Sequence, residues 1–406
     1  MNLRNQRMPA SAVLISFWAW SGLLCFPMIG LSVSLAGIPA GFASGGIVLI
    51  GQTAGLALFM ITTALTNFPR VISSPGRWNP AQIAIILIFY LSLTLQFHDD
   101  EMSTLSGIAY TCLLILTSLV LSVPWTLAPA DLEKCLSVAS VILCLFGISA
   151  MMILGLPQGR NVGDIQPNLF AAPLLVGFIF SQFRAGMTGV AVRIMCLSMV
   201  AMVSSRFALV GCTTAFVLHE LTFKPLSPWK IAALVMALIA GLLFWQEIIS
   251  LLALNDPDRD LSSGFTGRDE YWFHALAGIA NHPFGIGFKR TTALESGHSG
   301  YLKTLAEFGI VGGGLIIFLI VWVIALAGFE AVRSSGKDPQ QHRFACARFG
   351  GLVALAFGAS FQPQLLSLGD AFGMSFLFLL FKPRSNPAVL SRALTTNMAR
   401  KPLALF

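Results

Sequence analysis

Long runs of apolar residues recur along almost the whole chain, separated by short polar intervals. Many runs are about 17 to 25 residues long, the length that an α-helix needs to cross the hydrocarbon core of a membrane. Because backbone polar groups cannot stay unpaired in lipid, we expect these runs to be helices packed in one bundle. The pattern predicts about twelve spans, at 11–31, 45–66, 81–97, 104–123, 135–155, 169–183, 188–205, 207–219, 230–251, 305–328, 344–362 and 366–381.

The composition also indicates an integral membrane protein. Hydrophobic residues make up 56% of the chain and charged residues 11%, whereas soluble domains carry about 25% charged residues. No shift in composition marks a second domain, so we expect one all-α, polytopic membrane domain over residues 1–406. Its polar parts are a large loop at 252–304 and a tail at 382–406. The first run is expected to be an uncleaved anchor, and the seven cysteines, all in or beside predicted spans, imply no disulfide framework.

The distribution of basic residues predicts the orientation of the bundle. Lys and Arg are enriched in the cytoplasmic loops of membrane proteins, and the segment before the first run, MNLRNQR, is basic. With that segment in the cytoplasm, an even number of spans places both termini there and the 252–304 loop outside. The cytoplasmic side then receives 18 of the 25 Lys and Arg residues. The net charge of +7 is mostly this excess and requires no nucleic acid.

The long outer loop contains a predicted amphipathic helix. Thr266 and Asp269 have the spacing of a helix capping box, and Trp272, Ala275, Leu276 and Ile279 then follow the i, i+3, i+4, i+7 pattern of one helix face. The segment Asn281-His282-Pro283 should end the helix, because the residue before proline disfavours helical conformation. The glycines of 283–287 predict a tight loop after it.

Cations and a histidine follow in the same loop. Arg268 lies in the first turn of the predicted helix, Lys289 and Arg290 come after the glycine loop, and His298 precedes the next predicted span. Ser299 is a plausible N-cap for that span. The helix dipole there disfavours a protonated imidazole, so His298 is suited to accept a proton.

Two further arginines are predicted on the outer side. Arg206 follows Ser205 where the seventh run ends, and with so short a connection it must stay near the membrane surface. Charges at such depth are costly and are often functional. Arg160 lies in the polar segment 159–168, GRNVGDIQPN.

Three motifs carry a resemblance to a known family. They are the segment 159–168, the pair Ser205-Arg206, and a long motif over 267–312. The long motif contains, in order, Gly267-Arg268, Trp272, His282-Pro283, Gly285-Ile286-Gly287, His298-Ser299-Gly300-Tyr301-Leu302 and Glu307-Phe308-Gly309-Ile310-Val311-Gly312. In order and spacing these motifs resemble the O-antigen ligase and polymerase superfamily of bacterial inner-membrane glycosyltransferases.

The resemblance implies a GT-C-like bundle in the inner membrane and a periplasmic active site. The donor would be a glycan on undecaprenyl pyrophosphate, and the acceptor a glycan or glycolipid. Arg206 and Arg268 would hold the pyrophosphate, and His298 would activate the acceptor hydroxyl in an inverting reaction without a metal or cofactor. Substrate contacts are expected from Arg160, Lys289, Arg290 and Tyr301. Membrane lipid and chain-length-regulating or export proteins would be further partners.

Each of these residues also has an ordinary structural interpretation. Arg268 has carboxylates beside it at Asp269 and Glu270, Arg206 is placed where an arginine can extend its head group to the interface, and Lys289 with Arg290 forms a basic pair suited to solvent or lipid head groups. Tyr301 and Trp272 are typical interfacial anchors. The alternating acids Asp256, Asp258 and Asp260 do not make a calcium loop, which needs Gly at its sixth position and Glu at its twelfth.

Two classes of function remain open from the sequence. The favoured class is a membrane glycosyltransferase. Within it a polymerase is preferred over an O-antigen ligase acting on lipid A-core, because Ser-Gly-Tyr follows His298 where ligases commonly have a different continuation. The rival class is a solute transporter, which usually places polar groups at the bilayer midplane. A non-catalytic scaffold gives no reason for the grouping of arginine with histidine.

Overall fold

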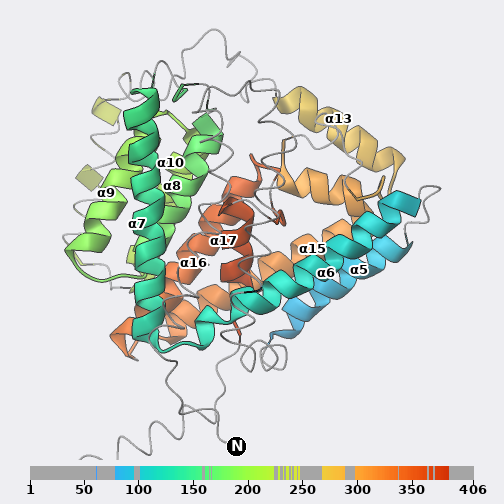
Figure 1. The fold of residues 1–406 in the computed structure, drawn as a ribbon, viewed down its shortest axis with the longest axis horizontal. Coiled ribbons are helices and arrows are strands. Elements are labelled where there is room, and N and C mark those ends of the chain that lie inside the picture. The colour runs from blue at the N-terminus through green and yellow to red at the C-terminus, as the bar shows by residue number, and fades with distance from the viewer. Residues whose placement is uncertain are drawn as a thin grey trace, which may run out of the picture.

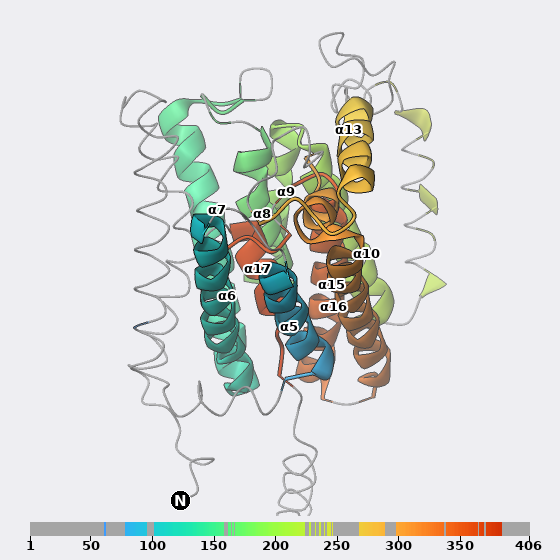
Figure 2. The ribbon, with the colours of Figure 1, turned by 90° about the vertical axis from the view of Figure 1, so that its right-hand side faces the viewer.

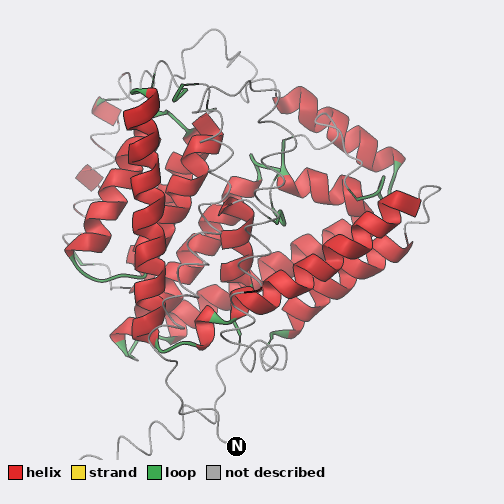
Figure 3. Ribbon diagram, in the orientation of Figure 1, coloured by secondary structure: helices red, strands yellow, loops and turns green. Residues whose placement is uncertain are grey.

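The structure is a computed structural model of the chain. It describes residues 78–95, 101–157, 161–163, 165, 167–223, 268–288, 298–336, 338–363, 365–368 and 371–383, with residue 61 and scattered positions within 227–246. These residues form helices and connecting loops, and none of them belongs to a strand (Figure 3).

The helices pack side by side in a bundle, with one helix lying across an end of it (Figures 1 and 2). They are α5 (Pro80–Leu95), α6 (Glu101–Ser122), the 3-10 helix η4 (Pro124–Thr126), α7 (Pro129–Leu154), α8 (Pro167–Ser181), α9 (Met187–Met202), α10 (Arg206–Phe223), α13 (Arg268–Asn281), α15 (Gly300–Arg333), α16 (Pro339–Ala359) and α17 (Ala371–Leu380). The helix at the end of the bundle is α13. The sequence predicted a helix in this segment.

The number of spans differs from the prediction. Within the described ranges, three helices are long and apolar enough to cross a membrane: Gly107–Thr126, Pro129–Leu154 and Gly300–Arg333. Other predicted spans correspond to shorter apolar helices, among them α8 with 15 residues and α17 with 10. At 1.5 Å per residue such helices are shorter than the roughly 30 Å hydrocarbon core. The fold is therefore that of an all-α membrane protein, but it does not support a count of about twelve. The run 11–31 and, apart from residue 61, the run 45–66 lie outside the described residues.

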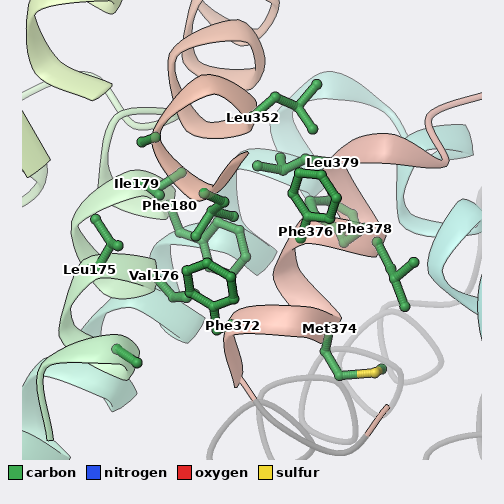
Figure 4. Packing of buried hydrophobic residues seen from close by; sticks show 14 of the residues in the cluster. Leu175, Val176, Ile179, Phe180, Leu352, Phe372, Met374, Phe376, Phe378 and Leu379 are labelled. Carbon is green, nitrogen blue, oxygen red and sulfur yellow. The ribbon is translucent and has the colours of Figure 1, made fainter. Parts of the chain in front are cut away.

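The core is rich in phenylalanine and centres on α17. All ten residues of this short helix are buried, as expected for a helix that is apolar on every side and enclosed by other helices. Figure 4 shows Phe372 and Phe376 of α17 among side chains of α8 and α16. Small residues bring helices close together elsewhere: a Cβ added to Gly350 of α16 would lie 2.7 Å from the carbonyl oxygen of Ala215 in α10.

The buried end of α17 receives its hydrogen bonds from four other elements. The carbonyl of Phe378 accepts from Trp125 Nε1 at 2.9 Å, and that of Leu379 from Arg348 Nε at 2.7 Å. The carbonyl of Leu380 accepts from Gln82 Nε2 at 2.5 Å, and that of Phe381 from Ser122 Oγ at 3.0 Å. The last carbonyls of a helix lack partners within the helix, so these side chains make its burial energetically tolerable.

Basic residues gather at this same end of the bundle, which we call the basic end. Arg348 Nη1 lies 3.1 Å from Glu330 Oε2, and Lys382 pairs with the other oxygen of Glu330. Arg343 Nη2 lies 3.0 Å from Glu133 Oε2. Helices α7 and α16 begin at this end, and α8, α15 and α17 finish there. We call the opposite end, where α8, α10 and α15 begin and where α13 lies, the motif end (Figure 1).

Candidate functional site

Unusual backbone conformations mark two of the predicted motifs. Among the described non-glycine residues, only Ser204 and His298 have a positive φ, of 48° and 49°. Such conformations cost free energy in ordinary L-residues and cluster at functional sites. Ser204 directly precedes Ser205-Arg206, and His298 is the predicted base. The two strained residues are therefore His298 itself and a residue that directly precedes the Ser205-Arg206 pair.

The motif around Arg206 is joined to the motif at 159–168. Helix α10 begins at Arg206, and the hydroxyl of the preceding residue, Ser205, donates a hydrogen bond of 3.1 Å to Asn168 Oδ1 at the start of α8. Before Asn168 the chain makes a tight turn, in which Val162 and Ile165 exchange backbone hydrogen bonds of 3.3 and 3.1 Å. Two motifs separated by some forty residues thus meet at the motif end.

His298 lies beside α13. Its ring contacts the ring of Tyr271 edge to face, with the ring centroids 5.3 Å apart. Tyr271 lies one helical turn after position 268, and residues three apart share a helix face. The structure describes the backbone of Arg268 but not its side chain, so the predicted role of Arg268 stays a prediction. The predicted N-cap is confirmed: the Ser299 side chain accepts from the backbone N–H of Leu302.

A break in α15 fixes the position of α13. Gly309 interrupts the helix with φ 74° and ψ 173°, and the loop 283–287 that follows α13 occupies the break. The Ile286 N–H donates to the Ala306 carbonyl at 2.8 Å, and the Ile310 N–H donates to the Pro283 carbonyl, also at 2.8 Å. The loop thus supplies hydrogen bonds that the interrupted helix lacks. The predicted tight loop is confirmed, and its glycines have φ values of 91° and 108°.

We expect Gly309→Ala to destabilise the protein. The backbone conformation at this residue is accessible essentially to glycine alone and costs other residues about 1–3 kcal/mol. In addition, the new Cβ would lie 2.4 Å from the carbonyl carbon of Phe284. The midpoint of thermal unfolding in detergent should fall, and α13 should become accessible to protease.

Gly314→Ala is the matched control for this substitution. Gly314 belongs to the same glycine-rich stretch of α15, but nothing lies within 4 Å of a Cβ added there. The control should unfold at or slightly above the midpoint of the unmodified protein, because alanine favours helix. Equal midpoints for the two variants would contradict the role given to the break.

The end of α16 contacts two of the three motifs. Phe207, next to Arg206, lies beside Gly358, and Trp272 of α13 lies 6.4 Å from Phe361, measured between ring centroids. At the start of α15 the Tyr301 hydroxyl donates to the Ala356 carbonyl at 2.7 Å. We call residues 356–362 the platform, because they contact the first turns of α10 and α15 and the bundle side of α13.

The electrostatics of the motif end favour anions. The N-terminus of a helix carries a partial positive charge and unpaired N–H groups, and α8, α10 and α15 all begin at this end. Arg206, partly buried in the first turn of α10, adds a full positive charge. Acidic residues do occur nearby, but the buried carboxylate of Glu307 has a cationic partner, with Lys303 Nζ 3.9 Å from its Oε1.

Other predicted residues have the following positions. Tyr301 joins α15 to the platform through its hydroxyl, and its contact with a substrate stays a prediction. Arg160, Lys289 and Arg290 lie outside the described residues, as do Thr266 and the acids at 256–260. Over the described ranges no three His, Cys, Asp or Glu side chains are grouped as metal ligands would be.

Sequence reasoning did not single out Tyr271 or Asn168 by themselves. Tyr271 could have been found from its spacing, since it lies one turn after Arg268 on the same face of the predicted helix. For Asn168 the sequence offers only its place in a motif, because its bond to Ser205 joins two different helices.

The assignment of function depends on this arrangement of residues. At the end of the bundle opposite its basic residues, the motif at 159–168 meets the Ser205-Arg206 motif through the Ser205–Asn168 hydrogen bond, and the platform contacts Phe207, Trp272 and Tyr301. Searches against protein-family models and curated proteins found no match to the chain.

Proposed function

We propose that the protein is a membrane glycosyltransferase that uses a glycan linked to a lipid pyrophosphate as donor, with polymerisation of the glycan as the preferred reaction. The motif end faces the periplasm, the basic end faces the cytoplasm, and the reacting groups meet at the motif end. The donor is undecaprenyl-pyrophosphate-linked, and the acceptor is a hydroxyl of a second glycan.

One observation carries the proposal: the strained residues Ser204 and His298 hold two functional motifs at the same end of the bundle. This end also has the helix N-termini that favour an anion, and the His298 ring contacts Tyr271 of α13, the helix that begins at Arg268. A cationic and imidazole-bearing surface suits a reaction in which negative charge develops on a departing pyrophosphate.

The proposed reaction divides the work between His298 and the two arginines. The His298 imidazole accepts the proton of the acceptor hydroxyl, whose oxygen attacks the anomeric carbon. The bond between that carbon and the pyrophosphate oxygen breaks with inversion, and its electron pair leaves with the pyrophosphate. Arg206 and Arg268 stabilise the growing charge through paired N–H donors, because the planar guanidinium group matches phosphate oxygens.

Arg206→Lys tests the proposed contact with pyrophosphate. Lysine keeps the charge but loses the paired donors, so transfer should fall by about 100- to 1,000-fold, the usual effect of removing one donor that stabilises developing charge. The measurement is glycan transfer by the purified protein in lipid nanodiscs, with lipid-pyrophosphate-linked donor and analysis of product length. Arg268→Lys should behave in the same way.

Arg333→Lys is the control, because Arg333 is exposed in the last turn of α15 at the basic end. It should keep normal transfer. If Arg206→Lys and Arg268→Lys also keep normal transfer, the proposed pyrophosphate site is wrong. If the unmodified protein transfers no glycan and instead carries a solute across vesicles, the protein is a transporter.

A further inference from the structure

Helix α13 has three distinct sides. The first side faces the bundle: Ala275 and Ile279 are buried, and Tyr271 and Trp272 are partly buried. Leu276, the third residue of the predicted apolar stripe, is 54% exposed and lies next to this side. By helical register position 268 belongs to the bundle side, since it precedes Trp272 by four residues and Ala275 by seven.

The two exposed sides of α13 differ in polarity. One carries Glu270, His274 and Asn281, all exposed. The other is apolar and has the helical spacing i, i+3, i+4, i+7, with the exposed residues Phe273, Leu276, Ala277 and Ala280. Phe273 is 72% exposed. A helix with separate polar and apolar exposed sides fits a boundary between water and hydrocarbon.

The apolar side of α13 continues into the exposed apolar side of α15. Phe284, 79% exposed, follows α13 directly and lies against the break at Gly309. On α15 the residues after the break, Ile310 and Val311, are also exposed. The same helix then exposes further large apolar residues along its length, namely Leu315, Phe318, Val321 and Trp322. Helix α15 is long and apolar enough to span a membrane. We therefore infer that its exposed apolar side faces the lipid.

We propose that the apolar side of α13, formed by Phe273, Leu276, Ala277, Ala280 and Phe284, is inserted into the acyl chains of the leaflet at the motif end, with phospholipid as its partner. Burying a large apolar side chain is worth about 1.5–3 kcal/mol, so Phe273 and Phe284 anchor the helix in the membrane. The polar side with His274 and Glu270 faces water. The inference concerns membrane contact and holds whichever reaction the motif end performs.

Photo-crosslinking tests the proposal on the full chain in native membranes. The photoreactive residue p-benzoylphenylalanine is placed at position 273, at position 274 as the matched control on the polar side, and at position 318 as a lipid-facing reference. All three positions are exposed, so each variant should insert and fold. After irradiation, phospholipid adducts are measured by mass spectrometry.

We expect the adduct yield at position 273 to approach that at 318 and to exceed that at 274 several-fold. Similar yields at 273 and 274 would overturn the proposal. No lipid adduct at 273, when position 318 gives one, would overturn it as well. A crosslink from 273 to another protein in place of lipid would show that a protein partner covers this side.

Discussion

Arg348→Met is expected to destabilise the bundle by about 3–5 kcal/mol, the usual effect of breaking a buried ion pair by removing one partner. Arg348 is buried, and it donates both to Glu330 and to the Leu379 carbonyl at the end of α17. Methionine keeps the apolar volume but leaves that carbonyl without its donor. The effect should lie toward the lower end of the range, because the Glu330 side chain is 40% exposed and keeps its contact with Lys382.

Thermal and denaturant unfolding in detergent measure this effect. Arg333→Met provides the control, because Arg333 is on α15, three residues after Glu330, and is exposed. The control should change stability by less than about 0.5 kcal/mol, as surface substitutions usually do. If the two variants unfold alike, then the hydrogen bonds at the buried end of α17 contribute little to stability.

The pattern of apolar runs predicted the positions of helices well but not their environment. The runs 135–155 and 169–183 correspond to α7 and α8, and 366–381 contains α17. Hydropathy alone, however, cannot separate a helix that lipid surrounds from one that protein surrounds. Helix α17 is apolar because it is enclosed by other helices, and its ten residues are too few to cross a membrane. This is one reason why the described residues do not support a count of about twelve spans.

Local signals at the candidate site were read correctly where they depend on neighbouring residues. The N-cap at Ser299 and the end of α13 before Pro283 both follow from the residues of one short segment. The break at Gly309 was not predicted, although a glycine-rich stretch is visible there. It exists because a separate loop donates hydrogen bonds into α15, and such long-range pairing has no signature in one sequence.

The contacts that bring the motif residues together could not be predicted for the same reason. The Ser205–Asn168 hydrogen bond and the Tyr271–His298 ring contact each join segments that are distant in the chain. Hydropathy placed these segments on one side of the membrane, which agrees with their position at the motif end. It gave no reason for them to touch, because contact depends on how α8, α10, α13 and α15 pack.

His298→Ala is expected to lower glycan transfer by about 100- to 10,000-fold, the range typical for loss of a general base. The structure also offers a sharper variant, His298→Gly. Glycine adopts positive φ without strain, whereas His298 holds a φ of 49°. If the residue is retained for chemistry at the expense of stability, the glycine variant should unfold at an equal or higher temperature and still be inactive. His274→Ala, exposed on α13, is the control and should be fully active.

Stability and transfer, measured on the same nanodisc preparations, separate the two roles of His298. A purely structural histidine would lose stability and activity together, and the glycine variant would recover both by relieving the strain. If the histidine is catalytic, both variants lose activity, while the fold and the Tyr271 side of α13 keep their structure. Near-normal turnover in His298→Gly would therefore show that His298 is not the general base. The strained backbone just before the first turn of α15 would then have no catalytic explanation.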